Sequence, residues 1–232
     1  MNIEQYRHEL KYRIDEAQMA VIRARMEALI HYDKHAANGQ YTIRSMYFDN
    51  YANRCFYENE SGTDPREKYR IRIYNADSKR ISLECKIKER GKTAKLSAVL
   101  SRNDFEKIMD GRPLSDFADP PDLLRKFVVL MQTQRFAPAV IVEYERAPFI
   151  YSIGNVRITL DQNIRSSTDF KNFFEVNLPT RPILAKGQHL LEVKYDELLP
   201  EFIKEALQLG NLQQTAFSKY YLCRRFSMGG QR

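Results

Sequence analysis

Residues 68–74 read Lys68-Tyr69-Arg70-Ile71-Arg72-Ile73-Tyr74. The strict alternation, with β-branched and aromatic members, is typical of a strand whose two faces differ. One face carries Tyr69, Ile71 and Ile73, and the other carries Arg70, Arg72 and Tyr74. Two guanidinium groups that lie side by side suit neighbouring phosphates. A solvated sheet face would give the same pattern, so the rest of the chain has to decide between these interpretations.

The composition indicates a basic globular chain. Its 232 residues are enough for one large domain or two small ones with a real core. Lys and Arg number 37 against 30 Asp and Glu, a formal charge of +7. This excess favours a polyanionic partner, which could be nucleic acid, an acidic membrane surface or a phosphate compound.

Cysteine usage and the distribution of apolar residues bear on the location of the protein. Cys55, Cys85 and Cys223 have neither close pairing nor the spacing of a metal site, which fits a reducing compartment. Residues 1–7 lack the apolar core of a secretory signal, and no uncharged apolar run approaches membrane-spanning length. We therefore expect a cytoplasmic protein with no membrane segment in this chain.

Strands and helices are predicted along the whole sequence. Alternation marks strands at 6–14, 41–49, 68–74, 80–88, 93–100, 139–146, 151–164 and 190–195, with a turn at 154–155 and an extension of the pairing at 55–59. Helices are expected at 15–30, 101–111, 122–133, 201–209 and 217–226. No repeat or linker divides the chain, so we predict one domain over 1–232, of α+β class with a mainly antiparallel sheet.

The one-sided charge of residues 68–74 recurs on other predicted strands. Charged residues share one strand face as Glu9/Lys11, Arg70/Arg72, Glu84/Lys86 and Glu192/Lys194, which are two positions apart, and as Arg157/Asp161, which are four positions apart. Each pair lies opposite an apolar or aromatic face, which the helices could cover. Closing the sheet into a barrel would remove its edges and place the charged faces in the lumen. So basic a lumen needs an anion, and phosphate chains are the natural candidates, with isolated carboxylates left to hold a divalent metal.

Eight short motifs follow one another along nearly the whole chain. They are Glu9-Leu10-Lys11-Tyr12, Ser45-Met46-Tyr47-Phe48-Asp49-Asn50, Tyr69-Arg70-Ile71-Arg72-Ile73-Tyr74, Leu83-Glu84-Cys85-Lys86, Tyr144-Glu145-Arg146, Val156-Arg157-Ile158-Thr159-Leu160-Asp161, Leu191-Glu192-Val193-Lys194 and Phe217-Ser218-Lys219-Tyr220. In this order they resemble the VTC-type polyphosphate polymerase domain, a branch of the CYTH or triphosphate tunnel metalloenzyme superfamily.

The resemblance implies both a fold and an activity. The implied fold is a mainly antiparallel β-barrel tunnel with helices packed outside. The implied activity is a metal-dependent polyphosphate polymerase, which transfers the γ-phosphoryl of ATP to a growing polyphosphate chain inside the tunnel. The implied partners are ATP and polyphosphate or triphosphate. Nucleic acid is not expected, because the charged faces carry too few aromatic residues for stacking platforms.

Position by position, the resemblance also implies site residues. The predicted catalytic residues are Lys11, Arg70, Arg72, Lys86 and Arg157, and the predicted phosphate-binding residues are Lys95, Arg146, Lys194 and Lys219. Glu192 is the predicted ligand of Mn²⁺ or Mg²⁺, and Asp161 is preferred to Glu143 and Glu145 as a further ligand. These residue types suit phosphoryl transfer, which relies on positioning and on cationic stabilisation of the equatorial oxygens.

Three activities remain open at this point. Arg7 stands where the superfamily pattern has a glutamate, which favours a polymerase over a hydrolase that gathers carboxylates round its metals. Ala216 stands where polymerase relatives carry a second lysine, one turn before Lys219. A non-catalytic polyphosphate-binding module therefore stays open, as does a triphosphatase that uses water as the acceptor. The sequence has no Gly-rich phosphate loop, Ser/His/Asp order or zinc spacing, so those classes are set aside.

Overall fold

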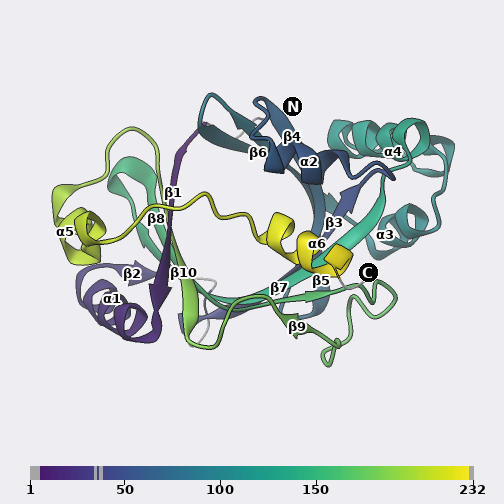
Figure 1. The fold of residues 1–232 in the computed structure, drawn as a ribbon. Coiled ribbons are helices and arrows are strands. Elements are labelled where there is room, and N and C mark those ends of the chain that lie inside the picture. The colour runs from purple at the N-terminus through teal and green to yellow at the C-terminus, as the bar shows by residue number, and fades with distance from the viewer. Residues whose placement is uncertain (1–5, 34–35, 37–38, 230–232) are drawn as a thin grey trace.

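The computed structural model describes residues 6–33, 36 and 39–229, and it arranges their strands in one curled antiparallel sheet (Figure 1). The strands are β1 (His8–Asp15), β2 (His31–Tyr32), β3 (Tyr41–Asp49), β4 (Arg66–Tyr74), β5 (Asp77–Glu89), β6 (Lys92–Leu100), β7 (Ala137–Tyr151), β8 (Val156–Ser167), β9 (Arg181–Pro182) and β10 (Gln188–Tyr195). The eight long strands follow the order β1-β10-β8-β7-β3-β4-β5-β6, while β2 pairs with β7 and β9 with β8.

The two ends of this sheet meet each other. The backbone N–H of Arg7 donates to the carbonyl of Thr93 at 3.0 Å, and the N–H of Thr93 donates to the carbonyl of Arg7 at 3.1 Å. The sheet therefore curls into a ring (Figure 1). Side chains of the long strands line a pocket inside this ring, which is called the lumen below. The predicted α+β class, with an antiparallel barrel and helices outside, is confirmed.

Helices cover the apolar outer faces of the strands. They are α1 (Glu16–Leu29), α2 (Arg54–Glu60), α3 (Arg102–Met109), α4 (Asp122–Gln134), α5 (Glu201–Leu207) and α6 (Lys219–Gly229), with short 3₁₀ turns η2 (Leu114–Asp116), η3 (Ile153–Asn155) and η4 (Leu209–Asn211). The ring of Tyr69 on β4 stacks on Phe127 of α4, with centroids 5.5 Å apart. On the other side, Tyr12 of β1 shares a core with Met26 of α1 and Ile203 of α5. None of the described helices is long and apolar enough to cross a membrane.

The local structure follows the sequence at two helix starts and departs from it at a third. Asp15 and Ser101 cap α1 and α3 with reciprocal side-chain bonds, as predicted. Residues 55–59, predicted to extend the pairing, instead form α2, so that prediction was wrong. The cause is Asp49, at the end of β3, whose carboxylate accepts from the N–H groups of Cys55 at 2.8 Å and Phe56 at 3.1 Å. It thereby satisfies the first donors of the helix.

A segment near the C-terminus, residues 212–218, runs along β1 and is called the strap below. The N–H of Thr215 donates to the carbonyl of Lys11 at 2.8 Å, and Gln214 bridges to Tyr12. The strap connects α5 to α6 across the ring in Figure 1, and α6 packs on β7 and β8. This path brings the start of α6 to the lumen.

Candidate active site

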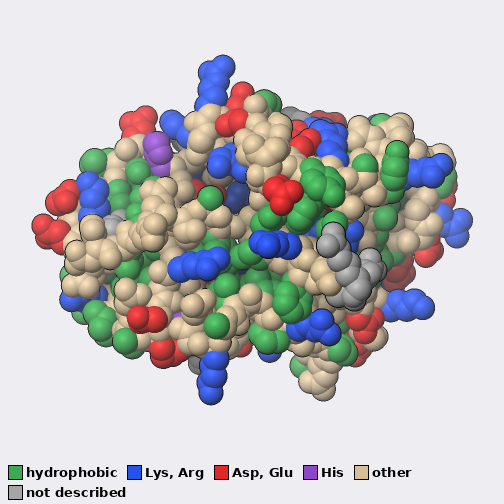
Figure 2. Space-filling model, in the orientation of Figure 1, with side chains coloured by type: hydrophobic (Ala, Val, Ile, Leu, Met, Phe, Trp, Pro, Cys, Tyr) green, Lys and Arg blue, Asp and Glu red, His purple; other side chains and the backbone are tan. Residues whose placement is uncertain are grey.

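The lumen of the barrel is a basic cavity of about 750 Å³. Within the described part of the chain, thirteen Lys and Arg side chains line it, against three carboxylates. The cations are Arg7, Lys11, Arg66, Lys68, Arg70, Arg72, Lys86, Lys88, Lys95, Arg146, Arg157, Lys194 and Lys219, and the acids are Glu9, Glu60 and Glu192. Figure 2 shows basic side chains in and around the hollow at the centre of one face. Such an imbalance attracts anions strongly.

Two arginines on β4 project into the lumen because side chains on a strand alternate between its faces. Arg70 donates to Glu84 through Nε at 2.7 Å and to the hydroxyl of Tyr47 at 2.7 Å. Arg72 donates to Ser45 at 3.2 Å and lies 3.7 Å from Glu84. Burial alone would raise the pKa of Glu84, but Arg72 and Arg70 outweigh it and lower the pKa. Glu84 therefore stays ionised and anchors both guanidinium groups.

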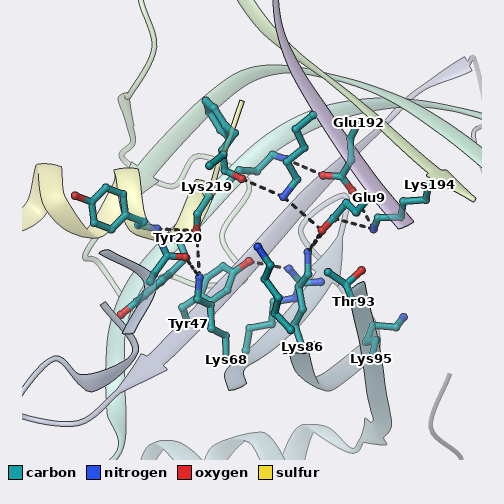
Figure 3. Close-up of a pocket in the computed structure, with 18 of the residues that line it drawn as sticks. Glu9, Tyr47, Lys68, Lys86, Thr93, Lys95, Glu192, Lys194, Lys219 and Tyr220 are labelled. Carbon is teal, nitrogen blue, oxygen red and sulfur yellow. Dashed lines mark hydrogen bonds and ion pairs between the residues drawn. The ribbon is translucent and has the colours of Figure 1, made fainter. Parts of the chain in front are cut away.

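A second group of charges joins β5, β1 and β10. Nζ of Lys86 donates to both carboxylate oxygens of Glu9 at 2.8 Å. Nζ of Lys194 lies 2.9 Å from Glu192 and 3.5 Å from Glu9, so it bridges the two acids. Lys11 lies 3.6 Å from Glu9 and donates to a strap carbonyl. In Figure 3, Lys86 and Lys194 point towards Glu9 from different sides.

A third group lies where α6 meets the barrel wall. Asp161 on β8 is fully buried and accepts two hydrogen bonds from Arg146 of β7, at 2.7 and 2.8 Å. Nζ of Lys219, the first residue of α6, lies 2.6 Å from Asp161 and 3.9 Å from Glu192. Arg146 and Lys219 also lie over the ring of Tyr144. Their charged groups are 5.2 Å and 4.7 Å from its centroid, respectively. The strap and α6 thus add a cation that no barrel strand supplies.

The structure brings ten of the predicted site residues to this one lumen and places the eleventh, Asp161, directly behind it. The two remaining cations are Lys95, which lies 3.6 Å from Glu84, and Arg157, which donates to Asp33 at 2.9 Å. Lys95 lies within β6, opposite Lys86, where a strand was predicted at 93–100. Ten of the eleven predicted residues line the cavity, and Asp161 lies behind Arg146 and Lys219.

Sequence reasoning missed several lumen residues that belong to the same pattern. Arg66 and Lys68 precede Arg70 at the same two-residue spacing, and Lys88 follows Lys86 in the same way. The alternation that selected Arg70 and Lys86 would have found all three. The hydroxyls of Tyr47 and Tyr144, which hold Arg70 and Arg72, gave no such signal because tyrosine is equally at home in a core.

The pKa values of Glu9 and Lys86 shift in ways that reflect their unequal surroundings. Burial would raise the pKa of Glu9, but Lys86, Lys11 and Lys194 outweigh it and lower the pKa to about 2. Burial lowers the pKa of Lys86 to about 7, because the carboxylates of Glu9 and Glu192, which raise it, are opposed by Lys11 and Lys194. The lumen therefore keeps its carboxylates ionised, and positive charges outnumber negative ones within it.

We expect acid to destabilise the protein in part through Glu9. The unfolded chain protonates this group near its ordinary pKa of 4.5, whereas the folded chain does so only near 2. The stabilisation is complete above pH 4.5 and is lost as the pH falls towards 2, by at most about 3 kcal/mol. Urea unfolding at pH 6 and pH 3 should show a smaller loss of stability for Glu9→Gln than for the wild type. Glu201→Gln, in an exposed pair on α5, should lose as much as the wild type. Equal losses for Glu9→Gln and the wild type would contradict this assignment.

The carboxylates of the lumen determine whether it could bind a divalent cation. The described residues contain no group of three or more His, Cys, Asp or Glu side chains that could hold a metal. Asp161 has both oxygens bound to cations. Of the three described acids that line the cavity, Glu9 and Glu192 lie together, since Lys194 contacts both, and Glu60 is the third. Mg²⁺ is commonly bound through one or two carboxylates plus substrate phosphates. The donor set thus fits a cation that arrives with a phosphate ligand.

Comparisons with known proteins agree with this geometry. The VTC domain family model matches residues 6–227. No curated protein sequence matches the chain. A candidate adenylyl cyclase from Hippeastrum with a dominant triphosphatase activity has a similar structure, with a TM-score of 0.57, 12% identity and coverage of 96% of each chain. A candidate adenylate cyclase from Bacillus halodurans has a TM-score of 0.54 and 14% identity, with coverage of 94% of this chain and 96% of that one. At these identities the similarity concerns the fold.

Proposed function

Because the chain belongs to the VTC domain family, we propose that it transfers the γ-phosphoryl group of ATP to a polyphosphate chain inside the barrel lumen, with Mn²⁺ or Mg²⁺. The observation that carries this proposal is the lumen itself, where thirteen cations among the described residues face three carboxylates. A long polyanion is the ligand that balances such a surface.

The cations divide the work of transfer by position. Arg70 and Arg72, fixed by Glu84, present planar forks that orient phosphate oxygens without reorganising during the reaction. Lys219 approaches from the strap side and adds a point charge opposite them. A terminal oxygen of the polyphosphate attacks the γ-phosphorus of ATP, a new P–O bond forms, and ADP leaves with the electrons of the broken bond.

Glu192 and Glu9 would hold the divalent cation on the protein side. When bound, the cation would neutralise charge on the phosphate oxygens. Lys194 lies between these two acids and keeps both ionised. In this arrangement the protein itself needs no covalent intermediate, since positioning and charge stabilisation account for most of phosphoryl-transfer catalysis.

Hydrolysis is the second candidate, since the Hippeastrum neighbour has a dominant triphosphatase activity. The two activities differ only in the acceptor, which is water in a triphosphatase. Arg7 favours transfer, because this lumen position carries a guanidinium paired with Asp196 at 2.9 Å instead of a further carboxylate for metals.

Product analysis tests the proposal. The purified protein is incubated with ATP and Mn²⁺ or Mg²⁺, with and without a polyphosphate primer, and ADP, orthophosphate and polymer are measured. We expect ADP and polymer in matching amounts, and no reaction when the metal is chelated. Orthophosphate in place of polymer would show that the protein is a triphosphatase. If no ADP forms at all, the proposal is wrong and a non-catalytic polyphosphate-binding module is the function that remains.

A further inference from the structure

One end of the lumen carries three cations that the mechanism above does not use. Arg66 and Lys68 lie on β4, and Lys88 lies opposite Arg66 on β5. All three line the cavity, between Asn59 of α2 and Ser218 of the strap. Arg66 and Arg72 are six residues apart, which is about 20 Å along an extended strand. Arg66 and Lys88 therefore lie at a mouth of the lumen, well away from Arg72, and Lys68 lies between this mouth and Arg70.

Among the described residues, these three cations differ from the deeper ones in forming no ion pair with a carboxylate. Within the ranges that the structure describes, no carboxylate forms an ion pair with Arg66, Lys68 or Lys88, whereas Arg70, Lys86 and Lys219 each have one. Arg66 donates to the carbonyl of Thr63 at 2.6 Å. Lys68 donates to Asn59 and, at 3.3 Å, to Ser218, and its ammonium lies 5.4 Å from the centre of the Tyr220 ring.

The surroundings of Lys68 make its positive charge costly. Besides burial, Arg66 from its own strand, Lys11 from β1 and Lys88 from β5 lower the pKa of Lys68, whereas the Cys55 thiol of α2 raises it. Burial, with Arg66 and Lys11, lowers the pKa of Lys68 to about 7. Burial and the same two neighbours lower the pKa of Lys88 as well, and the carboxylates of Asp64 and Glu9 oppose this shift only in part. An anion at this mouth would relieve the repulsion.

We propose that Arg66, Lys68 and Lys88 form a second phosphate subsite, which holds the part of a condensed-phosphate chain that extends beyond the reach of Arg70 and Arg72. The ligand class rests on the proposed function, and the subsite adds a preference for chains longer than triphosphate. Asn59 and Ser218 accept hydrogen bonds from Lys68 and fix the position of its ammonium group. Binding of the phosphate chain therefore costs little side-chain entropy at this residue.

Calorimetric titration with two phosphate ligands tests the subsite without any turnover. Inorganic triphosphate and a long-chain polyphosphate are titrated, at fixed ionic strength, into the wild type, Lys68→Met and Lys79→Met. Lys68→Met should weaken long-chain binding about tenfold, since a hydrogen bond to a charged group contributes about 1.4 kcal/mol or more. Triphosphate binding should change less than twofold. Lys79→Met, at a side chain that is 89% exposed, should change neither.

Several results would overturn the subsite. Equal weakening of both ligands would place Lys68 in the deep site, and unchanged long-chain binding would remove it from any site. Tight binding without ATP turnover would overturn the proposed activity while leaving the subsite in place. Turnover combined with unaltered long-chain binding in Lys68→Met would overturn the subsite alone.

A pH series with Lys68→Arg provides a second readout. With a pKa of about 7, Lys68 is mostly charged at pH 6 and mostly neutral at pH 8. The affinity of the wild type for long-chain polyphosphate should therefore fall as the pH rises from 6 to 8. Arginine keeps its charge throughout this range. Titration of Lys86 and of the phosphate ends contributes equally in both proteins, so the Lys68→Arg profile should be the flatter one. Identical profiles would contradict a direct contact between Lys68 and the chain.

Discussion

Replacing Arg72 with alanine is expected to lower the rate of phosphoryl transfer about a thousandfold and to leave the barrel folded. The side chain is only 7% exposed, and its guanidinium group is held by Ser45 of β3 and Tyr144 of β7. Loss of one positioned arginine removes stabilisation of charge on the transferred group. Glu84 keeps Arg70 and Lys95 as partners in the variant, so it is not left as an unpaired buried charge.

Two matched variants separate catalysis from folding. Arg72→Lys keeps the charge and loses the planar fork, so we expect an intermediate rate. Arg80→Ala removes an exposed arginine on β5, outside the lumen, and should behave as the wild type. The rate of ADP release at saturating ATP and the thermal midpoint are measured for each. An Arg72→Ala variant that stays folded and keeps a tenth of the wild-type rate would contradict the role assigned to Arg72.

Replacing Glu192 with glutamine should lower turnover about a hundredfold and raise the Mn²⁺ concentration needed for half-maximal activity. Glu192 is 4% exposed and faces the cavity from β10. The amide has nearly the same shape but no negative charge for a cation. Lys194 retains Glu9 at 3.5 Å, which limits the loss of stability.

The metal dependence distinguishes a ligand from a salt-bridge partner. If Glu192 only neutralises Lys194 and Lys219, Glu192→Gln would lower the thermal midpoint and leave the Mn²⁺ requirement unchanged. That result would remove Glu192 from the metal site. Glu201→Gln, at an exposed carboxylate of α5, serves as the control for loss of one negative charge.

The lumen was predictable because a strand has a side-chain period of two. Once Ile71 is assigned to the outer face, Arg70 and Arg72 must face inwards, and the same logic places Glu84 and Lys86. The capping box at Ser101 is equally local, since its bonds reach only three residues. Features of this kind depend on neighbours in sequence and are readable from it.

Other parts of the site depend on contacts between distant residues. Asp161 was predicted as a further metal ligand, with the role of a lumen counter-charge left open, and its partner Lys219, 58 positions later, lies 2.6 Å from it. The closure of the barrel depends on Arg7 and Thr93, which no local pattern connects. Helix α2 was missed because its first N–H groups are satisfied by Asp49, which belongs to the preceding strand. No propensity or periodicity encodes such partners.

The most direct test of the account is a crystal structure of the protein with Mn²⁺ and an ATP analogue whose γ-phosphate cannot be transferred. The account predicts phosphate density inside the barrel, within hydrogen-bond distance of Arg70, Arg72 and Lys86, with the metal at Glu192. Phosphates bound only outside the barrel, over an empty lumen, would contradict it.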